Sequence, residues 1–260
     1  MAGLKERYFA DGADPSGERV RLEALASFYA PWTQDWLTRR AALRPGMAVL
    51  EAGAGSGAML RWFAGAVGLQ GDVLGLDRTL AHMGELPAPV RLMEADLYDP
   101  PAEPGRFDLV YARLVLEHLP DPDAALVRLS QWLRPGGVLA IASLDFADVK
   151  AISGGEAGKR FDAGIAHIQA AIRNTGLVDP AFGRTLKDRF AAAGLEALTE
   201  DVLDRVSEGG SDWSRFLAAN NRVIGAMIGA GVFSAFAPAA AAAGAGLLVW
   251  QPLDVGDQVP

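Results

Sequence analysis

A glycine-rich turn, VLEAGAGSG over residues 49–57, follows a short apolar run and has the composition of a nucleotide-binding loop. Its glycines are Gly53, Gly55 and Gly57, so the spacing is G-x-G-x-G, whereas dinucleotide sites use G-x-G-x-x-G. Glu51 stands just before the turn. A carboxylate in that place repels a pyrophosphate and attracts a cation. The turn therefore favours a positively charged nucleoside ligand over a dinucleotide.

Two further acids stand near the ends of the next two apolar runs. DVLGLD (72–77) ends in Asp77, and PVRLMEADL (89–97) carries Asp96 near its end. An acid at the tip of a second strand is well placed to accept hydrogen bonds from ribose hydroxyls. The alternative for both acids is that they cap a nearby turn. Together with Glu51 they ring a pocket that suits a cofactor carrying an ammonium and a sulfonium.

Strands and helices alternate along the part of the chain that must position these residues. Apolar runs predict seven strands, at 47–53, 72–77, 89–97, 106–116, 138–145, 195–206 and 246–253. Helical spacing is present at 56–68, and Asp121-Pro122 predicts a helix start, with Asp as the N-cap and Pro in the first position. This order predicts an α/β fold with a doubly wound, mostly parallel, seven-stranded sheet, covered by helical N-terminal and C-terminal cap segments.

Composition excludes several classes of function. The chain has 260 residues, which fits one large domain or a core with an added cap. The net charge is −8 and no block of Lys or Arg occurs, so we expect no nucleic-acid partner. The absence of cysteine excludes disulfides, thiolate metal sites and a cysteine nucleophile. Asp145 and Asp148 could suggest a metal site, but no third ligand is evident, and we expect none.

The sequence indicates a cytoplasmic protein without a membrane partner. Its first residues are charged and lack the apolar core of a signal peptide. Residues 223–250 are uncharged and long enough to cross a bilayer. They are mostly Ala and Gly, with Pro238 in the middle, and the residues that give membrane affinity are sparse. We expect a pair of buried or lid-forming helices there, broken near Pro238.

The motifs taken in order resemble the class I S-adenosylmethionine-dependent methyltransferases. They are VLEAGAGSG, Asp77, Asp96, FDLVYARLVLEHLPDPDAAL and LRPGG, and the match covers residues 45–145. The nearest type is the small-molecule group related to quinone-biosynthesis methyltransferases. The resemblance implies a Rossmann-like fold, S-adenosyl-L-methionine as cofactor and a small-molecule substrate, with secondary metabolism as the setting. It also implies three parts, which are a cap segment at 1–45, a cofactor-binding core at 46–145, and the rest of the sheet at 146–260 with cap insertions near 146–177 and 208–245.

By that resemblance the cofactor is held by residues from four turns. Those that would face its methionine part are Glu51, which orders the ammonium, Gly53, Ala54, Gly55, Gly57, Arg113 and Leu114. Those that would hold its nucleoside are Asp77 on the ribose hydroxyls, Arg78 against the adenine, Asp96 on the adenine amino group and Leu97 through its backbone. Arg21 is the candidate for the cofactor carboxylate. The alternative for Arg21 is a helix-surface salt bridge with Glu18 or Glu23.

Methyl transfer from a sulfonium is an in-line displacement, so the protein mainly holds the nucleophile in place and excludes water. A base helps only where the nucleophile has a proton to lose. The candidates are His118, with bonding to nearby backbone as its alternative, and His167, with plain solvent exposure as its alternative.

Three functions are compatible with these motifs. The first is methyl transfer to an O, N or C atom of a metabolite. The second is a protein of this fold that binds the cofactor without transferring methyl, as a cyclase-like enzyme or a regulatory module. The third, an NAD(P)-dependent oxidoreductase, is disfavoured by the glycine spacing and the three acids. The sequence does not name the methyl acceptor. It is compatible with a homodimer and does not decide the oligomeric state.

Overall fold

An eight-stranded sheet forms the centre of the computed structural model, which describes residues 15–98, 104–152, 154–175, 178–202, 205–207, 211, 213, 216–217 and 248–258. The strands are β1 (Ala48–Ala52), β2 (Asp72–Asp77), β3 (Val90–Glu94), β4 (Phe107–Arg113), β5 (Leu133–Ala151), β6 (Glu196–Val202), β7 (Arg205–Ser207) and β8 (Leu248–Gln258). The helices are α1 (Pro15–Arg40), α2 (Ala58–Val67), α3 (Pro122–Gln131), α4 (Gly155–Thr175) and α5 (Leu186–Ala192), with short 3-10 turns η1 (Leu116–His118) and η2 (Gly183–Thr185).

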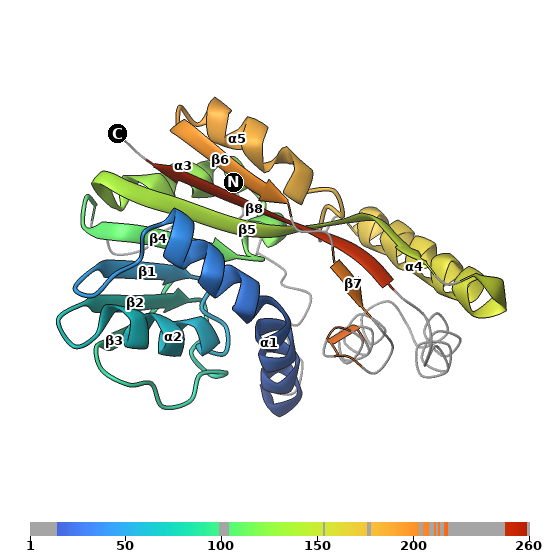
Figure 1. Ribbon diagram of the computed structural model, residues 1–260, viewed down its shortest axis with the longest axis horizontal. Helices are drawn as coiled ribbons and strands as arrows, with labels where there is room; N and C mark the ends of the chain where they lie inside the picture. The colour runs from blue at the N-terminus through green and yellow to red at the C-terminus, as the bar shows by residue number, and fades with distance from the viewer. Residues whose placement is uncertain are drawn as a thin grey trace, which may run out of the picture.

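The sheet has the order β3-β2-β1-β4-β5-β8-β6, with β7 paired to β8 (Figure 1). The first five strands in this order are parallel, and β8 runs antiparallel to its neighbours. The direction of winding reverses between β1 and β4. Open parallel sheets bind ligands beyond the carboxyl ends of their strands at such a switch point.

The predicted α/β sheet is confirmed for its five parallel strands, and two details differ. The described residues form eight strands rather than seven, because the strand predicted at 195–206 is divided into β6 and β7, which both pair with β8. Strand β5 does not end at residue 145, because Lys150 and Ala151 pair with β8 beyond an irregularity. The helix predicted from Asp121-Pro122 is α3, where the Asp121 carboxylate accepts a hydrogen bond from the Ala124 N–H at 2.9 Å.

Helices cover both faces of the sheet (Figure 1). On one face, Trp36 and Leu37 of α1 and Phe63 of α2 pack against β1 and β4. On the other, Leu126 of α3 and Phe190 of α5 join the apolar core. Because both faces are covered, the central strands are apolar throughout, as the sequence shows.

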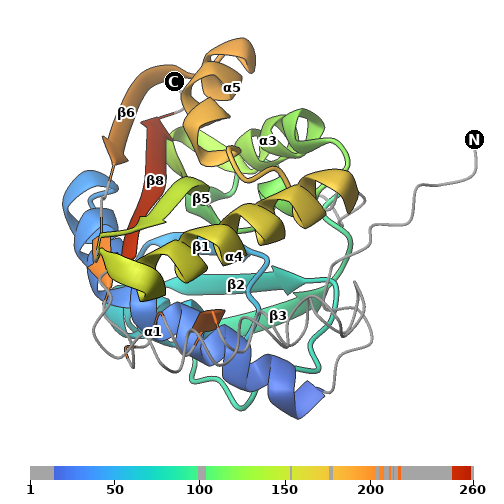
Figure 2. The same cartoon turned by 90° about the vertical axis from the view of Figure 1, so that its right-hand side faces the viewer.

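A third apolar cluster joins segments that are far apart in the sequence. In it Tyr29 of α1 packs with Phe161 and Ile165 of α4 and with Trp213 and Phe216. Seen from the side where β5 ends, α4 crosses in front of the sheet, with α1 beside it (Figure 2). This cluster of α1, α4, Trp213 and Phe216 packs against Leu114, which follows β4, so it lies near the carboxyl edge of the parallel strands. Below we call it the aromatic cover.

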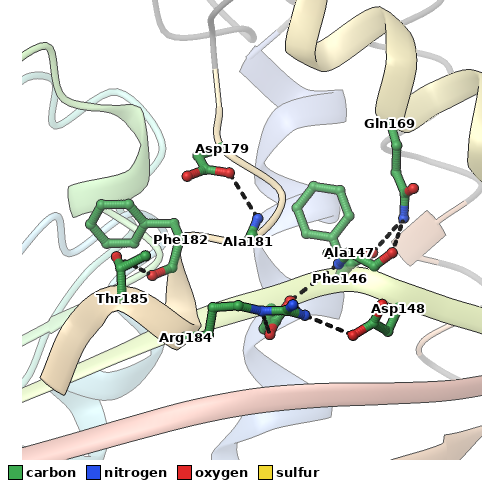
Figure 3. A network of polar contacts seen from close by, with 10 residues as sticks. Phe146, Ala147, Asp148, Gln169, Asp179, Ala181, Phe182, Arg184 and Thr185 are labelled. Carbon is green, nitrogen blue, oxygen red and sulfur yellow. Dashed lines mark hydrogen bonds and ion pairs between the residues drawn. The ribbon is translucent and has the colours of Figure 1, made fainter. Parts of the chain in front are cut away.

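Arg184 of η2 ties the end of β5 to the following segments (Figure 3). Its guanidinium bonds both carboxylate oxygens of Asp145, at 2.5 and 2.8 Å, and one oxygen of Asp148 at 2.8 Å. The Gln169 amide of α4 donates to the Phe146 carbonyl at 2.6 Å (Figure 3). Asp145 and Asp148, the two acids considered for a metal site, therefore form ion pairs with Arg184.

No helix among the described segments is long and apolar enough to cross a membrane. Of the uncharged stretch 223–250, only 248–250 is described, and these residues belong to β8. The helices predicted for the rest of that stretch, like most of the cap insertion at 208–245, lie outside the described residues.

Gly53→Ala tests the first glycine of the turn. Gly53 has φ +73°, and an added Cβ would lie 2.2 Å from Val115 Cγ2. The matched control is Gly105→Ala, where φ is +71° and a Cβ would meet nothing within 4 Å. The left-handed backbone alone costs a non-glycine residue about 1–2 kcal/mol. We expect Gly53→Ala to lower the free energy of unfolding by at least about 1 kcal/mol more than the control, because of the clash. Equal losses in urea unfolding would show that the turn has room for a side chain.

Candidate functional site

Three charged side chains gather at the carboxyl edge of the sheet on one face. In the register of the parallel strands, Glu51 of β1 is level with Gly75 of β2 and Tyr111 of β4. Asp77 and Arg113 each lie two residues further along these strands, so both share the face of Glu51. Tyr111 packs edge-on against Phe63 of α2, with ring centroids 5.7 Å apart. The charged group therefore lies on the face that α1 and α2 cover, at the switch point.

Glu51 is the most deeply enclosed of the three. Its side chain is only 4% exposed, and Oε2 has no hydrogen-bond partner among the residues that the structure describes. Burial raises the pKa of Glu51 from 4.5 to about 8, with Asp77 adding to the rise and Arg113 opposing it. A buried carboxyl oxygen without a partner is uncommon, because an unmet acceptor loses its hydration without compensation. The protein by itself thus holds an open polar position beside the glycine turn.

The glycine turn is held by the second strand. Asp77 Oδ2 accepts a hydrogen bond from the Gly55 N–H at 2.8 Å, and Oδ1 accepts one from the Thr79 N–H at 3.2 Å. The Gly53 N–H donates to the Leu76 carbonyl at 2.8 Å. Burial raises the pKa of Asp77 in spite of the bonds from Gly55 and Thr79. Because a carboxylate offers about four acceptor positions, both oxygens keep capacity for further donors.

Asp96 and Leu97 follow β3, the strand next to β2. Asp96 is exposed, and its Oδ1 accepts a hydrogen bond from the Tyr98 N–H at 2.8 Å, so it caps its own turn. Leu97 is buried in the core. Arg78 is exposed directly after β2. Turn capping, the alternative considered for both acids, is therefore present in the structure, and it leaves acceptor positions on each carboxylate.

Arg113 ends β4 beneath α1. Its Cζ lies 5.6 Å from the centre of the Tyr29 ring, a cation–π distance. Its Nη1 is buried and has no hydrogen-bond partner within the described part of the chain. The next residue, Leu114, has φ +56°, a conformation that a bulky side chain rarely adopts. The chain thus turns sharply after the arginine.

Arg21 makes the salt bridge considered as its alternative role. Its Nε and Nη2 donate to the two carboxylate oxygens of Glu18, at 2.7 and 2.6 Å. Both residues are 2% exposed, so the pair is buried and is not a helix-surface bridge. Arg21 Cζ also lies 5.9 Å from the centre of the Phe216 ring, in the aromatic cover.

The two candidate histidines lie in different surroundings. His118 ends η1 and is half-buried; burial, together with the positive charges of Arg21 and Arg78, lowers its pKa to about 3. A group with that pKa is neutral at pH 7 and is a weak base. His167 is exposed on α4, on the side away from Ile165 and Ile168 of the aromatic cover. The structure does not bring His167 to the charged group.

Glu117 is a buried polar residue to which the sequence alone assigns no role. It is 9% exposed, and its Oε1 accepts a hydrogen bond from the Ser143 hydroxyl at 2.8 Å. Burial raises its pKa to about 7. A charged residue just after a strand normally suggests a solvent-facing turn, so no local pattern signals this burial.

Comparison with known proteins identifies the family. The family described as a methyltransferase domain matches residues 23–200. The chain belongs to this methyltransferase family. A relative, methyltransferase str2 of Strobilurus tenacellus, is 34% identical over 180 residues, which are 68% of this chain and 62% of that protein. The ubiquinone biosynthesis O-methyltransferase of Xanthomonas campestris pv. campestris is 33% identical over 151 residues, covering 56% of this chain and 59% of that protein. The chain thus spans about three fifths of each relative's length.

A solved structure supports the fold. Haemonchus contortus phospholethanolamine N-methyltransferase 2, in complex with phosphomonomethylethanolamine and S-adenosylhomocysteine, has a TM-score of 0.62 and 16% identity. The match covers 99% of this chain and 61% of that one. The predicted resemblance to class I methyltransferases, including the quinone-biosynthesis type, is confirmed by these matches.

Glu51→Gln tests the buried carboxyl group through stability. Because the pKa of Glu51 rises from 4.5 to about 8, the folded state holds a proton that the unfolded chain releases. Stability is therefore lost as pH rises from about 4.5 to 8, and the loss levels off above the folded-state pKa. We expect Glu51→Gln to unfold at higher urea than the wild type at pH 8.5, by an amount on the order of 2–4 kcal/mol, and to differ little near pH 4.5.

The matched control is Glu85→Gln, at an exposed position. Glu117 keeps its own raised pKa in every variant, so some decline with pH should persist in Glu51→Gln. A constant difference between wild type and Glu51→Gln across this pH range would contradict a buried, titrating Glu51.

Proposed function

We propose that this protein is an S-adenosyl-L-methionine-dependent methyltransferase that moves a methyl group to an O, N or C atom of a small-molecule metabolite. The observation that carries the proposal is Glu51, whose buried Oε2, beside the glycine turn, has no hydrogen-bond partner among the described residues. Such an atom suits a ligand that brings a donor, as an ammonium does. It would be unfavourable beside a pyrophosphate, which brings only acceptors and negative charge.

The backbone of the turn supports the same ligand. Gly53, Gly55 and Gly57 all have positive φ, between 56° and 73°, so the turn bends tightly and exposes backbone to the site. A Cβ on Gly53 would run into Val115, so this part of the turn can carry no side chain. Together with Glu51 and Asp77, these residues fit the amino-acid and ribose parts of the cofactor.

Each further residue has a proposed role at this edge. Ala54 and Leu114 would line the methionine side together with the glycines, and Asp77 would accept from the ribose hydroxyls. Arg78, Asp96 and Leu97 follow β2 and β3 and would hold the adenine, by the order of strands in the sheet. Residues 46–145 would thus form the cofactor-binding core.

When bound, the cofactor supplies an activated methyl group on a sulfonium. The chain's part is to hold the acceptor atom in line with that group and to keep water out. The aromatic cover supports this role, because Tyr29, Phe161 and Trp213 place an apolar surface near the edge where the strands end. His118 is neutral at pH 7 and would serve as a hydrogen-bond partner of the acceptor rather than as its base.

Asp77→Ala tests the cofactor. Loss of hydrogen bonds to a charged group typically costs about 1.5–3 kcal/mol, so we expect S-adenosylhomocysteine to bind about 10- to 100-fold more weakly in calorimetry. The matched control is Asp72→Ala, at the other end of the same strand, where the carboxylate bonds Arg91. The control should retain wild-type affinity. Wild-type protein that bound NADH and not S-adenosylhomocysteine would overturn the proposal.

Transfer itself is tested with methyl-labelled cofactor and a metabolite extract. We expect the label to appear in the low-molecular-weight fraction. Binding of the cofactor without transfer to any fraction would favour a binding protein or cyclase-like enzyme, and label in RNA, DNA or protein would contradict a small-molecule acceptor.

A further inference from the structure

We propose that Arg113, and not Arg21, receives the carboxylate of the cofactor's amino-acid part. The inference rests on the proposed function and adds to it the residue that recognises this anion. It follows from how the structure uses the two arginines that lie near the site.

Arg21 already has a partner for its charge. Two of its nitrogens donate to the two oxygens of Glu18, at 2.7 and 2.6 Å, in the parallel geometry that arginine and carboxylate favour. Both side chains are almost fully buried. If Arg21 turned to a ligand, the Glu18 carboxylate would be left buried without compensation, which is strongly unfavourable.

Arg113 has an open position. Its Nη1 is buried and, in the described segments, has no hydrogen-bond partner, while the guanidinium Cζ lies 5.6 Å from the centre of the Tyr29 ring. A buried guanidinium N–H without an acceptor is costly, and a carboxylate is the anion whose shape matches it. The ring fixes the guanidinium, so little side-chain entropy remains to be lost on binding.

Arg113 and Glu51 complement one another across the switch point. They extend from the neighbouring strands β1 and β4 on one face. Ala112 pairs with Ala52, so Arg113 comes level with Gly53, the first glycine of the turn. Among the described residues, Glu51 keeps one carboxyl oxygen and Arg113 one guanidinium nitrogen without a hydrogen bond. An α-amino acid presents an ammonium and a carboxylate on one carbon, so a single ligand could satisfy both atoms.

The test compares two ligands that differ only in the carboxylate. Calorimetry measures S-adenosylhomocysteine and its decarboxylated analogue, which keeps the amine, against wild type, Arg113→Gln, Arg113→Lys and Arg21→Lys. We expect Arg113→Gln to weaken S-adenosylhomocysteine by about tenfold or more and to leave the analogue within about twofold. The affinity of Arg113→Lys for S-adenosylhomocysteine should lie between those of the wild type and Arg113→Gln, since lysine keeps the charge and lacks the planar guanidinium. Arg21→Lys should change the affinities for both ligands by the same factor.

The outcomes separate the two proposals. Wild type that binds neither ligand would refute the proposed function, and the inference with it. Wild type that binds S-adenosylhomocysteine, with Arg113→Gln unchanged or equally weakened toward both ligands, would overturn the inference alone. So would a selective loss in Arg21→Lys. If the wild type binds the analogue too weakly to measure, the S-adenosylhomocysteine affinity of Arg113→Gln decides, with its melting curve confirming that the variant is folded.

Discussion

The burial of one carboxyl group, Glu51, is the constraint around which the site is arranged. Glu51 is the last residue but one of β1, which lies between β2 and β4, and its side chain is buried on the face that α1 and α2 cover, so water cannot solvate it. Desolvation raises its pKa to about 8, and the protein by itself therefore carries Glu51 mainly in the neutral form at pH 7. The glycine turn follows one residue after Glu51, and its first glycine has a positive φ and lies too close to Val115 to carry a side chain.

A neutral Glu51 makes the site less negative than the three acids Glu51, Asp77 and Asp96 suggest in the sequence. Three acids in a row along the chain would indicate a permanent negative field. In the structure Asp96 is exposed and Asp77 is bonded to the backbone of the turn. The negative charge of Glu51 would appear with a further cation beside it, because the Arg113 charge alone does not offset the burial and another positive charge favours the ionised form. Selectivity for a cationic ligand would then come from this linkage between binding and ionisation.

The second organising feature is the aromatic cover. Tyr29 belongs both to this cluster and to the cation–π contact with Arg113, so α1 connects the sheet edge to α4. The same helix carries the buried Glu18–Arg21 pair, whose positive member helps to keep His118 neutral. At the other end of the helix, Trp36 donates to Asp201 of β6 at 2.6 Å, which fastens α1 to the far edge of the sheet. Helix α1 therefore contacts Arg113 at the switch point, the aromatic cover and strand β6.

Much of the architecture is determined by sequence pattern alone. Apolar runs buried on both faces, the Asp121-Pro122 helix start and the order of glycine turn and acids suffice to predict the parallel strands and the family, because they depend on local propensity and spacing. The tertiary structure decided what each charged residue does. Glu117 is buried against Ser143, and the Glu18–Arg21 pair is buried instead of lying on the helix surface. Arg113 keeps a donor without a partner among the described residues, and His167 is exposed. These outcomes depend on which side chains meet across the sheet and on how much water reaches them, and neither is a property of a residue's neighbours along the chain.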